Sequence, residues 1–141
     1  WKKTLDSIKI KMTTKSMPFA EALKLEKQCK TMFKASAWIA DYPDADNFMQ
    51  LFYGKNIKIT NNGCVKIPEY DRLYEQAQKM TPSPERDAIY AKMSRLLEVY
   101  MPVQVIGERY RNILAQPRVI GFKKHPILPA EWMYIDIDLK K

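Results

Sequence analysis

Two proline-led helical segments, divided by a proline-rich breaker, place the strongest constraint on how this chain folds. Pro68 stands where a helix can begin, because a first-turn residue needs no backbone N–H donor. The apolar residues that follow it recur at helical spacing, and they are Tyr70, Leu73, Tyr74 and Ala77. The sequence therefore predicts an amphipathic helix that packs by this face.

The breaker at residues 81–84 ends this helix and prepares the next one. Ser83 is predicted to be the N-cap of the second helix and Pro84 its first residue, and Glu85 and Asp87 suit the positive end of a helix dipole. The apolar stripe of this second helix consists of Ile89, Met93, Leu96, Leu97 and Tyr100. We interpret the stripe as part of the hydrophobic core.

Alternation or a short apolar run predicts β-strands in several other parts of the chain. These parts are residues 8–13, 35–40, 103–106 and 132–139, with residues 119–122 expected to be extended. Residues 57–67 fit either a hairpin around a Gly-containing turn or an irregular loop. Strands alternate with helices along the chain, so we expect the α/β class.

Two further helices are expected before Pro68. One follows Pro18, and a short one runs through residues 47–53 with Asp44 or Asp46 as its cap and Gly54 as its stop. The chain has 141 residues, which suffices for one domain with a core, and its eight Tyr, five Phe and three Trp exclude a disordered tail.

Net charge raises the question of an anionic partner. The chain carries 24 basic and 16 acidic residues, and its first 34 residues hold nine lysines against three acids. This pattern fits an adaptor that binds nucleic acid or an anionic surface, but it also fits a solvated lysine-rich face. The basic segment lacks Arg, the residue that dominates base and phosphate recognition, so we expect no nucleic acid partner and keep the adaptor as the alternative.

Residues that support enzyme chemistry are scarce. The chain has no nucleophile elbow, no zinc-protease motif and no phosphate-binding glycine loop, and His125 is its single histidine. We expect no catalytic residue, no metal site and no cofactor. Cys29 and Cys64 either pair or stay as buried thiols, since pairing depends on a separation that the sequence does not give.

The segment from Trp38 to Asp44 is the most unusual in the chain. Asp41 follows what we interpret as a buried apolar strand, and the carboxyl end of a strand is where α/β proteins place ligands. A ligand ammonium would pair with the Asp41 carboxylate, and Trp38 would supply an aromatic wall. Alternatively, Asp41 caps the following turn and Trp38 belongs to the core.

An ordered set of motifs extends from this segment through the rest of the chain. The set is Trp38-x-Ala40-Asp41-Tyr42-Pro43-Asp44-Ala45-Asp46-Asn47-Phe48, Leu51-x-Tyr53-Gly54-x-Asn56, Pro68-Glu69-Tyr70-Asp71-x-Leu73, Glu85-Arg86 and Gln116-Pro117-x-Val119-x-Gly121-Phe122. With this set the chain resembles family 5 of the bacterial extracellular solute-binding proteins, the peptide-class binding components of ABC importers. It departs from the family at Lys9, where glycine is common, at Lys55, where proline is usual, and across residues 57–66.

The resemblance implies a type II periplasmic-binding fold, in which two α/β lobes close on a solute. Family members are several times longer, so residues 1–141 would be a single partial domain, the late part of the second lobe with a C-terminal segment that returns toward the hinge and first lobe. In the oligopeptide binders of the family, the Asp of the W-x-A-D motif pairs with the peptide α-ammonium and the Trp lies beside it.

These roles carry over to Asp41 and Trp38, and Tyr42 is added as a ligand-binding candidate. The resemblance further implies a non-enzymatic protein of the periplasm. The implied partners are a peptide or other small solute, ABC permease subunits and the remainder of the same polypeptide. The chain opens Trp-Lys-Lys without a signal peptide, which we interpret as processing or as a piece of a longer protein.

Overall fold

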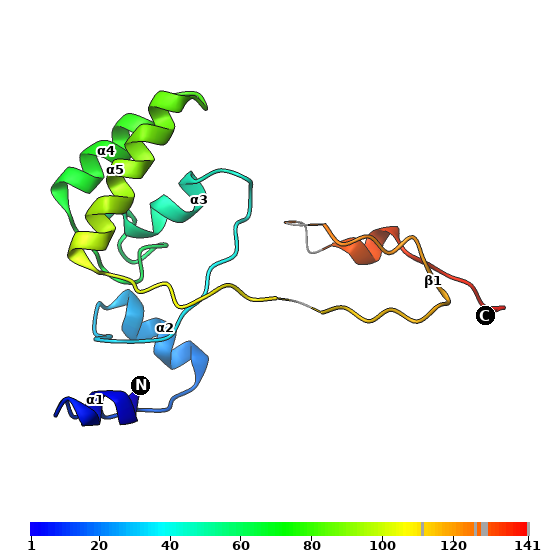
Figure 1. Ribbon diagram of the computed structural model, residues 1–141, viewed down its shortest axis with the longest axis horizontal. Coiled ribbons are helices and arrows are strands. Elements are labelled where there is room, and N and C mark those ends of the chain that lie inside the picture. Colours follow the sequence, from blue (N-terminus) through cyan, green and yellow to red (C-terminus); the bar gives the residue numbers. More distant parts are fainter. Residues whose placement is uncertain (111, 126, 128–129, 141) are drawn as a thin grey trace.

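The computed structural model describes residues 1–110, 112–125, 127 and 130–140, and helices dominate its secondary structure (Figure 1). The α-helices are α1 (Lys2–Ser7), α2 (Phe19–Lys27), α3 (Asp46–Met49), α4 (Pro68–Ala77) and α5 (Pro84–Tyr100). The 3₁₀ turns are η1 (Gln50–Phe52), η2 (Gly54–Asn56) and η3 (Glu131–Tyr134). Strands β1 (Val119–Ile120) and β2 (Asp136–Ile137) pair antiparallel, with Val119 opposite Ile137. The described part of the chain is therefore mostly helical with a minor sheet.

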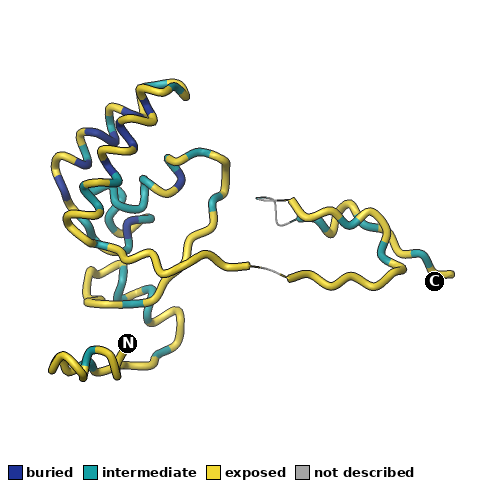
Figure 2. The backbone as a smooth tube through the Cα atoms, in the orientation of Figure 1, coloured by how far each residue is buried: buried dark blue, intermediate teal, exposed yellow. Residues whose placement is uncertain are grey.

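The core lies between α4 and α5, which run side by side, and the buried positions of Figure 2 concentrate there. Its buried apolar members are Ile67, Tyr70, Leu73, Tyr74, Ala77, Ile89, Tyr90 and Met93, with Leu96 and Leu97 partly buried against them. The predicted faces of both helices are thus confirmed. Tyr100 is the exception, since it is 62% exposed. The reason is length: α5 has 17 residues against ten in α4, so its last turns extend beyond its partner.

The predicted starts of both helices are also confirmed. Pro68 and Pro84 are first-turn residues, and the Ser83 hydroxyl accepts a hydrogen bond from the backbone N–H of Arg86 at 3.3 Å. This bond satisfies one of the donors that a helix N-terminus leaves without an intrahelical partner. The cap fixes where α5 begins and so sets which of its residues face α4.

The short helix near residue 47 has Ala45 as its N-cap, without a side-chain cap bond, so neither predicted acid is its N-cap. Asp44 lies one residue before this N-cap. Its carboxylate accepts the backbone N–H of Asp46 at 2.8 Å. Gly54 does not act as a left-handed stop. Its N–H instead donates to the Asp71 carboxylate at 2.7 Å, and a Cβ on Gly54 would lie 2.5 Å from an Asp71 oxygen. A side chain at position 54 would therefore displace the Asp71 carboxylate and weaken its bond to the Gly54 N–H.

Residues 57–67 form an irregular loop rather than a hairpin. Fully buried Asn61 organises this loop, because its amide donates to the backbone carbonyls of Tyr53 and Val65 at 3.0 and 2.8 Å. Its side-chain oxygen accepts the N–H of Val65 at 3.1 Å. A side chain thus supplies the bonds that a second strand would otherwise make.

Three of the predicted strands are wrong in this structure, and with them the expected α/β layering. Residues 8–13, 35–40 and 103–106 form no strand, and residues 132–139 give a 3₁₀ turn followed by the two-residue β2. A strand is stable only when a neighbour accepts and donates its backbone hydrogen bonds. Residues 8 and 9 instead end α1: the N–H groups of Ile8 and Lys9 bond back to Leu5 and Asp6 at 3.1 and 3.0 Å. Lys9 there has a φ of 62°, a left-handed conformation that favours glycine.

Large apolar side chains are exposed along the segment that follows the core. They are Val99, Tyr100, Met101, Val103, Val105, Ile106, Tyr110, Ile113 and Leu114. The segment leads from α5 toward the separate β1–β2 hairpin (Figure 1). No helix in the described ranges combines the length and apolar character needed to cross a membrane.

A disulfide bond joins Cys29 to Cys64 across 35 positions of sequence, with Cα atoms 5.8 Å apart. The structure therefore decides between the two alternatives that the sequence leaves open. α1 and α2, both fully described, contain no buried residue. The disulfide thus attaches the lysine-rich first part of the chain covalently to the loop in front of α4.

Candidate functional site

One buried side chain holds two of the three candidate residues. The indole Nε1–H of Trp38 donates to the Oδ1 atom of Asn47 at 2.8 Å, and the backbone N–H of Asp41 donates to the same atom at 3.3 Å. Asn47 is fully buried at the second position of α3. The start of α3 therefore fixes where the indole of Trp38 and the backbone of Asp41 lie.

The indole of Trp38 and the side chain of Asp41 are open to solvent. Trp38 is 39% exposed, and the Asp41 carboxylate makes no hydrogen bond or ion pair with any described residue. The expected burial of residues 35–40, and of Asp41 directly after them in sequence, is wrong for this structure. In the described chain no second layer covers this segment, so Ile39 is 61% exposed. The nearby acid whose carboxylate accepts a backbone N–H is Asp44, which bonds to Asp46.

Tyr42 lies in a neighbouring hydrogen-bond network centred on Asp46. The Tyr42 hydroxyl donates to the Asp46 carboxylate at 2.6 Å, and the amide of Gln78 donates to the other carboxylate oxygen. The hydrogen bond to Asp46 raises the pKa of Tyr42, with a smaller contribution from burial. Tyr42 thus holds the loop to Asp46, and the bond from Gln78 connects Asp46 to the end of α4.

Arg86 connects this loop to the core. It is 9% exposed, its Nη1 atom contacts the Asp44 carboxylate at 2.6 Å, and its Nε–H donates to the carbonyl of Ala77 at 3.3 Å. Its guanidinium also lies 4.9 Å from the ring centroid of Tyr90. One arginine thus joins the site loop, the end of α4 and the face of α5.

The Asp44–Arg86 pair predicts a loss of stability in acid. The hydrogen bond from Arg86, followed by that from the Asp46 N–H, holds the pKa of Asp44 below its ordinary value. A depressed folded-state pKa gives stabilisation that is complete above the unfolded-state pKa of about 3.9 and is lost as the pH falls through the folded-state value. We expect the free energy of unfolding, measured in urea between pH 7 and pH 2.5, to decline below about pH 4.

Asp44→Asn should be less stable at pH 7 and should show a shallower decline in acid. Glu75, whose pKa is lowered mainly by its hydrogen bond with Lys55, supplies part of the slope that remains. Equal slopes for the wild type and the Asp44→Asn variant would contradict the assignment to Asp44.

Sequence reasoning missed Asn47 and Arg86 as residues that build the site. Arg86 could have been found, because it lies three and seven residues before Ile89 and Met93 and therefore shares their face of α5. A charged residue on an apolar stripe indicates a buried partner, and an acidic cluster was present near residue 44. Asn47 belongs to the motif that begins at Trp38, but its residue type and position do not by themselves indicate a buried acceptor.

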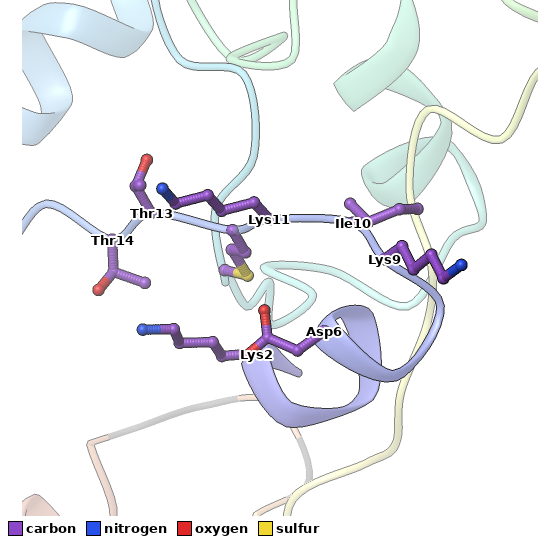
Figure 3. Close-up of a pocket in the computed structure, with 8 residues that line it drawn as sticks. Lys2, Asp6, Lys9, Ile10, Lys11, Thr13 and Thr14 are labelled. Atoms are coloured by element: carbon purple, nitrogen blue, oxygen red, sulfur yellow. The ribbon is translucent and has the colours of Figure 1, made fainter.

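Two surface depressions lie outside the Trp38–Asp41 segment. One is formed between α1 and residues 9–14, where the Lys2 and Lys11 side chains extend in the same direction with the Asp6 carboxylate between them (Figure 3). The other is lined by Tyr53, Lys55 and Glu75, and Glu75 accepts both the Tyr53 hydroxyl and the Lys55 ammonium at 2.7 Å. Glu75 offsets the charge of Lys55 in the second depression, whereas three lysines and a single acid line the first. Among the described residues, no group of His, Cys, Asp and Glu could hold a metal ion.

Comparison with known proteins places the chain near periplasmic binding proteins. It is 28% identical over 134 residues to YgiS of Escherichia coli K12, which is named as a probable deoxycholate-binding periplasmic protein. It is 30% identical over 86 residues to a protein of Haemophilus influenzae Rd that is named as a binding protein. No family model matches the chain.

These alignments cover 95% and 61% of the chain but only 24% and 16% of the two relatives. The chain therefore spans about a quarter of the E. coli relative. Both relatives are named as binding proteins rather than enzymes, and the Cys29–Cys64 disulfide is typical of proteins outside the reducing cytoplasm. The chain is thus distantly similar to periplasmic binding proteins over part of their length.

Proposed function

We propose that this chain is part of the solute-binding component of a bacterial ABC importer and acts in the periplasm. Its similarity to two binding proteins, one of them named periplasmic, supports this proposal. The disulfide and the ordered motifs around Trp38 and Asp41 support it further. Permease subunits of the importer are the proposed downstream partners.

Residues 1–141 would form a single partial domain, the late part of the second lobe of a two-lobed type II binding fold. The length of the E. coli relative, of which the chain spans 24%, supports this assignment. Exposed apolar side chains at Ile39 and at the adjacent Val105 and Ile106 support it as well, because such exposed residues mark a surface that another part of a protein covers. The remainder of the same polypeptide is the proposed cover for these residues.

The proposed ligand is a peptide, bound through its α-ammonium and main chain. The observation that carries this proposal is that one buried oxygen holds both Trp38 and Asp41 while the carboxylate of Asp41 stays unpaired among the described residues. A free carboxylate beside an aromatic face suits a cation. Deoxycholate is itself a carboxylate, so Asp41 would repel its charged end even if Trp38 packed on its ring system.

Asp41→Asn in the full-length protein is expected to weaken binding of a free-amine peptide by about 10- to 100-fold, the usual contribution of a hydrogen bond between charged groups. Calorimetry with a free-amine peptide, its N-acetylated form and deoxycholate measures the effect. The acetylated peptide should bind the wild type as weakly as the free peptide binds the variant.

Glu98→Gln is the matched control for this experiment. It removes the same charge from an exposed residue of α5 and should leave the affinity unchanged. Equal affinity of the wild type for the free and the acetylated peptide would exclude the ammonium role of Asp41. Tighter binding of deoxycholate than of either peptide would exclude a peptide as the ligand.

A further inference from the structure

Asn47 is the most completely buried polar residue that touches the proposed site. Its side chain is 0% exposed, and its Oδ1 atom accepts hydrogen bonds from both Trp38 and Asp41. No other described side chain bonds to both residues. Any change at Asn47 therefore reaches the two ligand-facing residues together.

The amide nitrogen of Asn47, Nδ2, lowers the stability of the folded state. This atom is buried and makes no hydrogen bond of ordinary geometry with a described residue, although the Asn47 side chain acts on the neighbouring Tyr42 hydroxyl and lowers its pKa. A buried donor without an acceptor costs about 1–3 kcal/mol, and natural structures contain few of them. A residue retained purely for stability at this position would be apolar, since an apolar side chain of the same shape avoids this cost.

Asn61 shows what a purely structural buried asparagine looks like in the same molecule. It is also 0% exposed, but both ends of its amide are bonded, to the backbone of Tyr53 and Val65. It contacts neither Trp38 nor Asp41 through any of these bonds. The two asparagines therefore differ in what their hydrogen bonds hold, and not in burial.

We infer that Asn47 is a positioning residue of the proposed solute site, an inference that rests on the proposed function. It holds the Trp38 indole and the Asp41 backbone in one arrangement before the solute arrives. Binding to a preorganised pair avoids the entropy cost of ordering two side chains in the complex. The Nδ2 atom that lacks an acceptor is the cost of this arrangement.

Asn47→Leu separates positioning from folding. It keeps the number and branching of the side-chain heavy atoms and removes both the acceptor and the buried donor. The two N–H groups that lose their acceptor belong to residues that solvent reaches, so the midpoint of urea unfolding should stay close to that of the wild type. Affinity for the free-amine peptide should fall by about tenfold, one charge-assisted contact being no longer held in place. Asn61→Leu should do the opposite, lowering the unfolding midpoint and leaving affinity unchanged wherever the protein is folded.

A spectroscopic readout tests the positioning without any ligand. In a Trp1→Phe, Trp132→Phe background, Trp38 supplies the single indole N–H resonance that residues 1–141 contribute. Asn47→Leu should shift this resonance and speed its exchange with solvent, whereas Asn61→Leu should leave both as in the parent.

The outcomes distinguish this inference from the proposed function. If the wild type binds none of the peptides, the proposed function fails. If the wild type binds peptide and Asn47→Leu binds equally well, or leaves the Trp38 resonance unmoved, the positioning role fails and the proposed function stands. If Asn61→Leu weakens binding as much as Asn47→Leu at equal folded fraction, the role of Asn47 is structural and the inference is overturned.

Discussion

Arg86→Ala is expected to lower the free energy of unfolding by about 3 kcal/mol. Removing one partner of a buried ion pair leaves the other charge without compensation, and Asp44 retains 27% exposure, which places the loss at the lower end of the usual range. The variant also loses the bond to the Ala77 carbonyl and the contact with the Tyr90 ring. Urea unfolding followed by helical circular dichroism measures the change.

Arg95→Ala provides the control, because Arg95 is an exposed arginine of the same helix. It should change stability by less than about 0.5 kcal/mol. A similar effect of the two substitutions would show that Arg86 contributes no more than an ordinary surface residue. Double substitution of Asp44 and Arg86 should cost less than the sum of the single changes, since the two residues share one interaction.

Cys29→Ser with Cys64→Ser is expected to release the lysine-rich first 34 residues from the core. Closing a loop of 35 positions contributes about 3–4 kcal/mol in the chain-entropy account. Because α1 and α2 bury no residue, few other contacts replace this contribution. Trypsin should cleave the variant within residues 1–34 roughly 100-fold faster, while α4 and α5 stay resistant.

Reduction with dithiothreitol should reproduce this cleavage in the wild type and should have no effect on the serine variant. Slow cleavage of the reduced wild type would show that noncovalent contacts hold the N-terminal part in place. Cleavage spread evenly over α4 and α5 would show that the disulfide stabilises the core itself.

The helical pair could be predicted from sequence because each of its signals is local. A proline at the first helical position, a serine before it and an apolar stripe all act within a few residues. Ser83, Pro84 and the Tyr70 face accordingly agree with the structure. Tyr100 disagrees because its burial depends on the length of α4, a property of another segment.

The strands could not be predicted in the same way. The alternation in residues 8–13 and 103–106 describes which side chains would face inward, but a strand forms only with a partner. Residues 35–40 show the same limit: the run is apolar, yet its burial requires a layer that the described chain does not place there. Fold class therefore depends on long-range pairing that local patterns do not contain.

The candidate site contains residues that the sequence indicates and one that it does not indicate. Trp38 and Asp41 stood out by residue type and order, and the structure joins them through one acceptor. Their acceptor did not stand out, because an asparagine near a helix start is ordinary.

The close partnership of α4 and α5, joined by a short connection, has a consequence for the order of assembly. Contacts between neighbouring helices form on microsecond to millisecond timescales, whereas thiol oxidation takes seconds to hours. The helical pair is therefore in place before its covalent bridge closes. Cys64 would therefore be oxidised when its loop already packs against the folded helical pair. Only the N-terminal part that carries Cys29 would still have to move for the disulfide bond to form.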